Sequence, residues 1–578
     1  MVLAGECSKE ENVLVVDYKG DPVDKTKTGG WLGAGLILGT ELAERMCVMG
    51  IGMNLVTYLV GDLHLSNSQS ATVVTNFMGT LNLLALLGGF LADAKFGRFL
   101  TVAIFSMIAA LGATLLTIST SVKSMRPPPC DNFRLMQHGC IPASGGQLAM
   151  LYASLYTIAL GAGGIKSNCS GFGSDQFDPK DPKEEKAMIF FFNRFYFCIS
   201  IGSLFAVTVL VYLQDNVGRG WGYGISAVAM ALSVMVLVAG TPKYRYRVPE
   251  GSPLTVIWKV LYLAFKQRKV AYPKDPNELE GYFTANVAHT EKFRCLDKAA
   301  ISVVGNRSSP EKQSKKRSST VTEVEEVKMV VKLLPIWATC ILFWTIYSQM
   351  TTFSVEQATY MDRRITGSFL FPSGSLSVFL FITILTFTSL NEKLLVPIAG
   401  RITHNSQGIT SLQRIAVGLF FSMLAMAVSA IVEKKRRDAS NNENNSISVF
   451  WLVPQFFLVG AGEAFAYVGQ LEFFIREGPA RMKSMSTGLF LATVSMGFFF
   501  SSLLVTLVDK VTKRTWITNN LNKGRLDYFY WMLAILGAVN FVVFLVLARR
   551  HEYKVERDIQ EIELKDDKVE EAVKGMDV

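Results

Sequence analysis

Runs of about 20 apolar residues recur along this chain, and they constrain its fold more than any other feature. A run of that length crosses the roughly 30 Å hydrocarbon core of a bilayer when it forms an α-helix. The chain has 578 residues, half of them hydrophobic, which is too apolar for ordinary soluble domains. We therefore predict an all-α membrane protein with twelve transmembrane helices, near residues 31–59, 70–93, 98–120, 147–171, 187–212, 221–240, 333–355, 374–396, 411–433, 449–475, 485–509 and 527–549.

Six of the predicted helices precede a long polar segment and six follow it. Two six-helix bundles joined by a linker can rock about a site between them, which is the plan of an alternating-access transporter. A short amphipathic helix is expected near Pro253 to Lys269, on the membrane or on the bundles, with a solvated loop as the alternative. The predicted parts are an N-terminal tail at 1–30, a first bundle at 31–240, a linker at 241–332, a second bundle at 333–549 and a C-terminal tail at 550–578.

The net charge of +10 comes from basic residues that lie mainly in loops beside the predicted helices. The linker carries Arg245, Arg247 and the cluster from Lys315 to Arg317, and the positive-inside rule places it in the cytosol. An even number of crossings on either side then places both termini in the cytosol too. This distribution indicates a lipid bilayer as partner and argues against nucleic acid. The expected location is the plasma membrane, with the vacuolar membrane as the alternative.

One loop disagrees with this orientation. Four basic residues, Lys434 to Arg437, follow the ninth predicted helix on its expected outer side. A few residues later Asn444 begins an Asn-Asn-Ser sequon, and glycosylation requires an outer or lumenal loop. We keep the topology and take Asn444 as a candidate glycosylation site.

Motifs for catalysis and metal binding are missing from the sequence. The eight cysteines form no CxxC pair, the five histidines lie in loops or at helix edges, and neither HExxH nor GxSxG occurs. We therefore expect no enzyme, no metal and no cofactor. Cys130 and Cys140 share the outer loop after the third helix, where oxidising conditions would allow a disulfide; two loop thiols are the alternative.

Charged residues inside the predicted helices mark the expected functional site. Inserting one charged side chain near the bilayer centre costs roughly 2.5 to 3.5 kcal/mol of free energy, so each should be paired or face water. Glu41, Glu44 and Arg45 lie three and four residues apart on one face of the first helix. Two carboxylates beside one guanidinium suit a proton carrier, since the arginine can neutralise one glutamate while the other takes up a proton. A structural ion pair is the alternative.

Lys166 in the fourth helix and Glu463 in the tenth are lone opposite charges in opposite halves of the chain. If they meet between the bundles, they form a salt bridge that holds one conformation, or Lys166 meets an anion instead. The alternative is that each faces a water-filled cavity separately.

Several motifs resemble those of known transporters. Residues 88–99, GGFLADAKFGRF, resemble the cytosolic motif of the major facilitator superfamily, in which Asp93 and Arg98 would form a latch across helix ends. Residues 191–203, FFNRFYFCISIGS, are similar to a fifth-helix signature of the proton-coupled oligopeptide transporters, with Ser200 in place of the usual Asn. ELAER, residues 41–45, is similar to the ExxER motif of that family, and GFGSDQFD, FRCLDKAAI, LPIWATCILFW and LNKGRLDYFYW resemble its plant nitrate and peptide transporter members.

The resemblance covers nearly the whole chain and is strongest to the branch that contains the dual-affinity nitrate transporter. It implies the major facilitator fold, proton coupling at Glu41, Glu44 and Arg45, and a salt-bridge or coupling role for Lys166 and Glu463. That branch places a histidine of the seventh helix on nitrate, where this chain offers Tyr347, a neutral phenol that can donate one hydrogen bond. The candidate substrate residues are Tyr347, Gln349 and Tyr467.

Thr101 follows Arg98 by three residues, a spacing that a kinase directed by basic residues could read. A phosphate there would disturb the latch at Asp93, and the alternative is an unmodified threonine that caps its helix. This makes Thr101 a candidate phosphorylation site and a kinase a candidate partner.

The expected function is symport of protons with a small anion, above all nitrate. Its rivals are proton-coupled transport of a plant hormone, a specialised metabolite or a short peptide, and a nutrient sensor whose transport is secondary. The sequence gives no indication of the oligomeric state.

Overall fold

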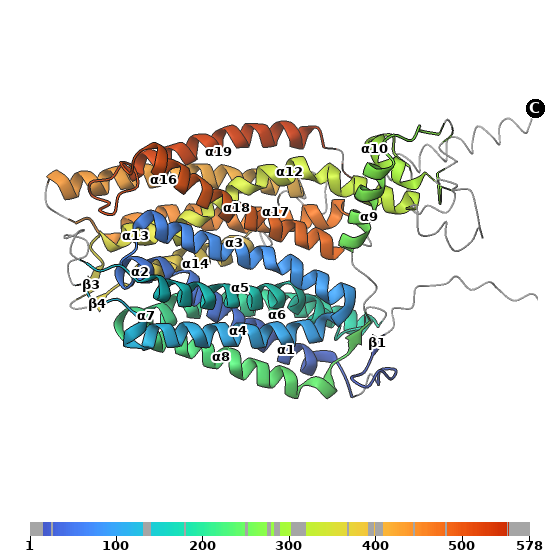
Figure 1. Cartoon of the computed structure of the whole chain (residues 1–578), viewed down its shortest axis with the longest axis horizontal. Coiled ribbons are helices and arrows are strands. Elements are labelled where there is room, and N and C mark those ends of the chain that lie inside the picture. Colours follow the sequence, from blue (N-terminus) through green and yellow to red (C-terminus); the bar gives the residue numbers. More distant parts are fainter. Residues whose placement is uncertain are drawn as a thin grey trace, which may run out of the picture.

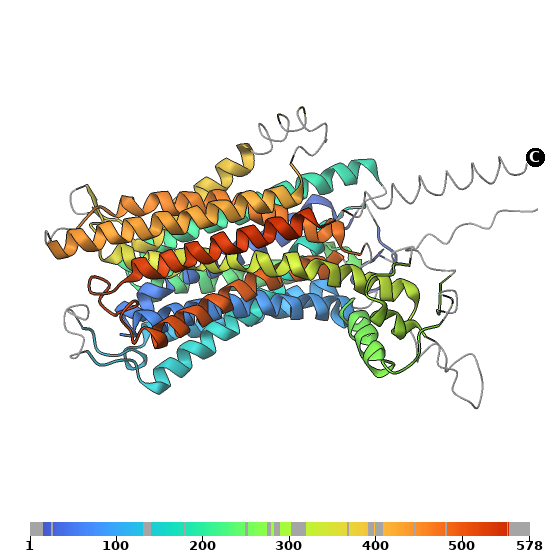
Figure 2. The same cartoon turned by 90° about the horizontal axis from the view of Figure 1, so that it is seen from above.

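The computed structural model describes residues 15–24, 27–130, 140–178, 181–248, 253–273, 275, 279–282, 289–301, 319–366, 369–390, 398, 401, 409–442, 446–479, 483–551 and 553. Long helices run side by side through these residues, the N-terminal ones in one layer and the C-terminal ones in the other (Figure 1). The linker elements lie together at one end, which we call the linker end (Figures 1 and 2). The predicted fold of two six-helix bundles is confirmed.

The first bundle contains six long helical segments, two of which are built from several elements. The first, second and third are α1 (Gly30–Gly52) with α2 (Leu55–Gly61), α3 (Asn67–Leu91), and α4 (Gly97–Ser121) after the π-helical turn η1 (Ala92–Phe96). The fourth, fifth and sixth are α5 (Gly145–Ser174), then α6 (Pro182–Phe205) continuing through η3 (Ala206–Leu210) into α7 (Val211–Asn216), and α8 (Arg219–Ala239).

The second bundle also contains six segments among the described residues. They are α12 (Val321–Thr351) with α13 (Phe353–Thr359), α14 (Ser377–Leu390), α16 (Ser411–Asn442), α17 (Val453–Glu477), α18 (Lys483–Val511) and α19 (Leu526–Arg549). Short 3₁₀ turns accompany the helices at η2 (Lys123–Met125), η4 (Thr241–Lys243), η7 (Ser373–Leu376) and η9 (Val449–Leu452).

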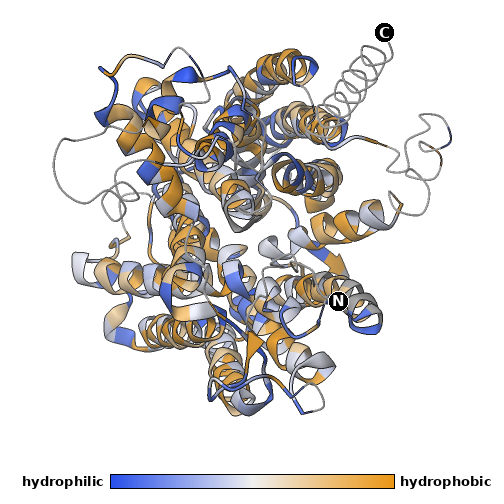
Figure 3. Cartoon of the chain, turned by 90° about the vertical axis from the view of Figure 1, so that its right-hand side faces the viewer, coloured by the Kyte–Doolittle hydropathy of each residue, from blue (hydrophilic) through white to orange (hydrophobic). Residues whose placement is uncertain are grey.

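Ten described segments are long and apolar enough to cross a membrane by length and composition, and one of them, Asn67–Ser121, holds both α3 and α4. Helix α1 is not among the ten because Glu41, Glu44 and Arg45 interrupt it. Figure 3 looks onto the linker end and shows hydrophobic residues over most of the helices. The large apolar side chains left exposed, such as Leu507 and Val539, are those of a lipid-facing surface.

Helices α4 and α5 approach very closely because small residues line their contact. A Cβ added to Gly161 would lie 2.3 Å from the backbone nitrogen of Ala109, and one added to Gly164 would lie 2.2 Å from the ring of Phe105. Only glycine permits so close an approach of the two helices.

The linker forms a small core of its own at the linker end. Helix α9 (Pro253–Lys266), α10 (Arg294–Asp297) and η6 (Lys298–Ala300) pack on the first turns of α12 through Val260, Leu263, Leu296 and Val324. The predicted amphipathic helix is therefore present as α9. Helix α12 begins at Val321, twelve residues before the predicted boundary. Lys328, one of the charged residues that ended the apolar run, pairs with Glu325 at 2.7 Å and with Asp297 at 2.6 Å. Because these charges neutralise one another, the helix can include them.

Two short antiparallel sheets stand outside the bundles. Strand β1 (Val15–Val16) pairs with β2 (Tyr246–Arg247) in the register Val15 to Arg247, at the linker end. Strand β3 (Arg364–Thr366) pairs with β4 (Phe369–Leu370) at the opposite end. The described part of the N-terminal tail is thus joined to the start of the linker.

The basic loop expected at 434–437 is helical instead. Helix α16 continues to Asn442, and two of the four basic side chains are buried. The guanidinium of Arg436 donates to Glu433 at 2.8 Å, and Arg437 pairs with Asp527 at 2.5 Å. These pairings explain how basic residues can stand at an end of the bundle where the charge rule does not expect them. Asn444 lies outside the described residues.

Candidate functional site

Helix α1 carries the three charged residues of the predicted cluster, and all three are buried within the bundle. The Nε atom of Arg45 donates to Oε1 of Glu41 at 2.9 Å and lies 3.0 Å from Oε2 of Glu44. Both carboxylates are 1% exposed. The spacing of three and four residues therefore brings the cluster together as expected.

The two glutamates receive fewer hydrogen bonds than buried carboxylates usually do. Oε2 of Glu41 and both carboxylate oxygens of Glu44 have no hydrogen-bond partner among the described residues. Burying a charged group without donors is costly in free energy, and binding a proton removes the charge. Glu44 is thus the carboxylate of the cluster that receives no hydrogen bond from the described residues.

The expected Lys166–Glu463 salt bridge is absent from the described residues. Instead, Nζ of Lys166 donates to Oδ1 of Asn82 on α3 at 2.6 Å. The amide of Asn82 donates in turn to the carbonyl of Met78 at 2.8 Å, which orients the oxygen toward Lys166. Lys166 nevertheless lies within electrostatic range of Glu463 and of the α1 cluster.

Glu463 belongs to α17 in the second bundle. Its Oε2 atom is buried without a hydrogen-bond partner among the described residues, and the carboxylate interacts electrostatically with Tyr347 of α12. Charges from α1, α5 and α17 therefore meet between the two bundles, which is the position expected for the site.

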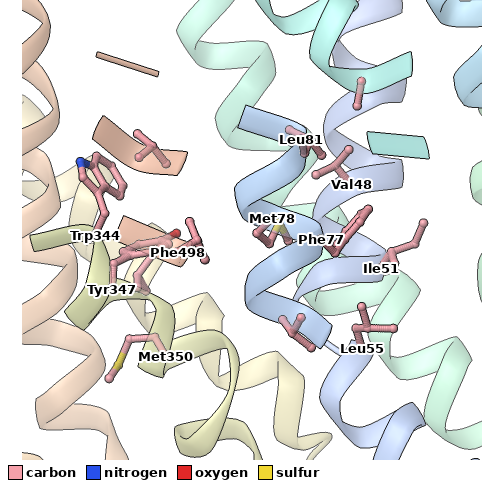
Figure 4. Close-up of a cluster of buried hydrophobic side chains, with 14 of the residues drawn as sticks. Val48, Ile51, Leu55, Phe77, Met78, Leu81, Trp344, Tyr347, Met350 and Phe498 are labelled. Atoms are coloured by element: carbon pink, nitrogen blue, oxygen red, sulfur yellow. The ribbon is translucent and has the colours of Figure 1, made fainter. Parts of the chain in front are cut away.

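Tyr347 lies in an aromatic cluster of the second bundle. Its ring centroid is 5.5 Å from that of Trp344 and 6.4 Å from that of Phe498. Figure 4 shows this group on one side and Val48, Phe77 and Met78 of the first bundle on the other. Tyr467 joins the same cluster through Trp344, at 6.3 Å, and through Phe490, at 4.7 Å.

Gln349, the third substrate candidate, lies on a different face of α12 from Tyr347. Residues two apart on an α-helix point about 200° from each other, so Gln349 faces away from Tyr347. Its amide donates to the hydroxyl of Ser501 on α18 at 2.9 Å, and the side chain is fully buried. Its other amide atom, Oε1, is buried and has no hydrogen-bond partner among the described residues, so the substrate contact expected of Gln349 stays a prediction.

The predicted latch uses a different acid. Nη1 of Arg98 pairs with Asp175, at the end of α5, at 2.7 Å, and no described ion pair joins Arg98 to Asp93. Burial raises the pKa of Asp175, and the nearby guanidinium of Arg98 opposes that rise. The sequence identified the arginine correctly but could not show which carboxylate the packing of α5 brings to it.

Thr101 is fully buried, and its hydroxyl donates to the carbonyl of Gly97 at 2.8 Å. The hydroxyl thus bonds back within α4 rather than capping it. A kinase could reach it only after α4 moves. At the opposite end of the bundle, Cys130 and Cys140 form a disulfide, with Cα atoms 5.8 Å apart.

The two ends of the bundle interface differ. Away from the linker, the amide of Asn67 donates to the carbonyl of Thr518 at 3.1 Å, and Ser377 contacts the sulfur of Met53 at 3.5 Å. Toward the linker, a cavity of about 290 Å³ reaches Ala85 and Ser167, which neighbour Asn82 and Lys166. The charged residues are therefore closer to a cavity on the linker side, while contacts between the bundles close the other side.

Asn82 is a site residue that the sequence analysis missed. A usable signal existed, because Asn82 is a polar residue in the apolar run TLNLLALLGG of α3. A buried polar side chain in such a run needs a partner within the bundle.

Comparison with known proteins supplies the family. The sequence profile described as "PTR2: POT family" matches residues 99–523. Protein NRT1/PTR FAMILY 6.4 of Arabidopsis thaliana is 65% identical over 571 residues, covering 98% of this chain and 96% of that protein. Protein NRT1/PTR FAMILY 6.3 of the same plant is 48% identical, covering 95% of this chain and 96% of that protein.

Solved structures agree on the fold. The crystal structure of the POT family transporter PepTSo superposes with a TM-score of 0.66 at 21% identity, covering 90% of this chain and 98% of that one. The crystal structure of an auto-inhibited POT family peptide transporter superposes with a TM-score of 0.65 at 20% identity, covering 90% of this chain and 97% of that one. The chain therefore belongs to the POT family, among its NRT1/PTR members, and is a membrane transporter rather than an enzyme.

Proposed function

We propose that the protein is a symporter that carries a small anion, nitrate above all, together with protons by alternating access. The charge balance of the buried site carries this proposal. Arg45 and Lys166 supply two positive charges, and Glu41, Glu44 and Glu463 supply three negative ones. With all five ionised the site has one net negative charge; two bound protons leave it with one net positive charge, which an anion can balance.

The energetics of uptake require the same number of protons. Moving a monovalent anion into a compartment that is negative inside costs about 2.3 kcal/mol per 100 mV, and one accompanying proton only cancels this cost. Two protons make the step electrically favourable. Glu44 and Glu463 are the proposed proton carriers because both hold buried oxygens that receive no hydrogen bond among the described residues.

The proposed cycle begins in an outward-open state in which Glu44 and Glu463 bind protons. The anion then enters beside Lys166 and Tyr347, whose hydroxyl can donate one hydrogen bond to it. After the bundles rock, the cavity at Ala85 and Ser167 provides the exit toward the linker end, which we propose is cytosolic. The return of Lys166 to Asn82 resets the site.

The proposed setting is the plasma membrane, with both termini in the cytosol. The basic residues of the linker start, Arg245 and Arg247, support this orientation.

Labelled-nitrate uptake in oocytes at acidic and at neutral pH tests the proposal. The native chain should take up nitrate faster at acidic pH than at neutral pH. At acidic pH, Glu44→Gln should take up nitrate at least about tenfold more slowly than the native chain, because a neutral amide cannot carry the proton. Glu291→Gln, which removes an exposed carboxylate from the linker, should behave as the native chain. Native chain at the cell surface without nitrate uptake would refute the choice of anion.

One observation favours a second candidate, a larger organic acid. Trp344, Tyr347, Tyr467 and Phe490 form a continuous aromatic wall beside the charges. Such a wall suits an aromatic carboxylate better than nitrate. Tyr347→His distinguishes the two: nitrate uptake that is present only in this variant would assign the native chain to the larger acid.

A further inference from the structure

A second cavity lies away from the proposed transport site. It has a volume of about 800 Å³ and is bounded by α3, α5 and α18, at the end of the bundle opposite the linker. Its walls therefore come from both bundles. The proposed transport cycle uses none of the residues that line it.

The cavity opens toward lipid rather than toward the site between the bundles. On α3 its lining residues Thr72, Val73 and Asn76 share a face with Leu83 and Leu87, which are 42% and 41% exposed. On α18, Thr506 and Lys510 share a face with Leu503 and Leu507, which are 59% and 54% exposed. Exposed leucines on both walls are those of a surface in contact with acyl chains.

The charged residues of the cavity are gathered at the end of α18. Lys510, Lys513 and Arg514 line it together with Asp509. The contact from Nε of Arg514 to Oδ2 of Asp509 is 3.6 Å, too long for a hydrogen bond. The other oxygen of Asp509, Oδ1, is buried and has no partner among the described residues. This oxygen needs a donor that the described protein does not supply.

The backbone presents these cations at a conformational cost. Lys513 and Arg514 have φ angles of 50° and 62°, in the left-handed region that usually takes glycine at a helix end. The amide of Arg514 closes the turn by donating to the carbonyl of Asp509 at 3.0 Å. This turn places two cationic side chains beside the cavity.

The cavity lining combines charged residues with apolar and aromatic ones. The charged residues lie at the end of α18, whereas Val73, Tyr152 and Tyr156 lie about one to three helical turns deeper. The rings of Tyr152 and Tyr156 are 6.4 Å apart and form one wall. Charged groups at one end and aromatic and apolar side chains beyond them match an amphiphile with a charged head and an apolar body.

We propose that this cavity binds an aminophospholipid, with its ammonium donating to Oδ1 of Asp509 and its phosphate beside Lys510 and Lys513. Phosphatidylethanolamine has the required chemistry, since its ammonium carries three donors next to an anion. Phosphatidylcholine carries none on its quaternary nitrogen. A lipid here touches α3 of one bundle and α18 of the other, so it stabilises the closed contact at this end.

Lipid retention by the purified full-length chain tests this proposal. The protein is exchanged into detergent containing phosphatidylethanolamine and phosphatidylcholine with identical chains, and the bound lipid is quantified by mass spectrometry. We expect a preference for phosphatidylethanolamine of about tenfold, the effect of one hydrogen bond to a charged group. Its mono- and dimethylated forms, which keep a donor, should be retained better than phosphatidylcholine.

Three variants define the contacts. Asp509→Leu should abolish the preference, and Asp509→Asn, which keeps the shape and one acceptor, should reduce it. The double variant Lys510→Gln, Lys513→Gln should lower retention of both lipids and leave their ratio unchanged. Asp438→Leu, which removes a half-exposed carboxylate after Arg437, serves as the matched control and should keep the preference.

Equal retention of the two lipids by the native chain would overturn the proposal. So would a preference that survives Asp509→Leu, or phosphatidylglycerol held as tightly as phosphatidylethanolamine, which would assign the cavity to anions in general. Retention is measured without substrate and without a proton gradient, so failure here is distinct from failure of the proposed transport.

Discussion

At the scale of single residues, the partner of Lys166 decides whether a proton must bind before the ammonium can leave that partner. In the structure this partner is the neutral Asn82, so no bound proton is needed to release the ammonium. Asn82→Asp should form a buried ion pair with Lys166, which is hard to separate in a low dielectric, and should lower uptake at least about tenfold at every pH. Measured uptake across the pH range checks this, with Asn82→Gln as the control that keeps a neutral acceptor. Native-like uptake in Asn82→Asp would contradict the role of this contact.

The residues of the site could be predicted from the sequence better than their partners could. Glu41, Glu44 and Arg45 are on one helix, so spacing alone brought them together. The partners of Lys166 and Arg98 come from other helices, α3 and α5, and depend on packing that no periodicity encodes. Gln349 follows Tyr347 by two residues yet bonds to Ser501 of α18, because residues two apart point to opposite sides of a helix.

At the scale of elements, the extension of α16 depends on buried charge pairs. Arg436 is 1% exposed, and both of its contacts to a carboxylate are made with Glu433. Glu433→Gln should destabilise the protein by about 3 to 5 kcal/mol, because the guanidinium stays buried without its counter-charge. Thermal unfolding in detergent measures this, and Asp438→Asn at a half-exposed position should change stability by less than about 0.5 kcal/mol. Equal melting of the two variants would contradict the account.

The start of the linker is held by a second charge pair that responds to pH. Arg245 pairs with Glu184 at 2.7 Å, and the hydrogen bond from this guanidinium lowers the pKa of Glu184. A carboxylate with a lowered pKa stabilises the folded state above its unfolded pKa and loses that contribution as pH falls through the folded value. The protection of the β2 amides, measured as exchange relative to the unfolded chain at the same pH, should therefore fall below about pH 4, under the ordinary glutamate value, and Arg245→Gln should remove this pH dependence. If Arg245→Gln shows the same pH dependence as the native chain, the Arg245–Glu184 pair is not its cause.

Helix boundaries were predictable where apolar runs ended in loops and were wrong where charges paired. Helices α3, α4 and α19 begin and end within a few residues of their predicted limits. Helices α12 and α16 extend farther because Lys328, Arg436 and Arg437 are neutralised by buried acids. A prediction from composition places such charged residues in solvent and therefore ends the membrane helix before them.

At the scale of the whole molecule, the bundles are closed at one end and leave a cavity near the other. If they rock, contacts such as Met53 to Ser377 must open during each cycle. The pair Met53→Cys, Ser377→Cys should cross-link under oxidation and stop transport, and reductant should restore it. Each single cysteine variant is the control. Full transport by the cross-linked protein would rule out rocking about this closure.

The ratio of charge to nitrate taken up tests the central proposal most directly. Current and labelled uptake are recorded together in the same voltage-clamped cells expressing the native chain. Two protons per nitrate predict about one net positive charge entering with each anion. This equals the net change in charge of the buried site when it binds two protons and the anion. Uptake without current, or with net negative charge moving inward, would contradict the account.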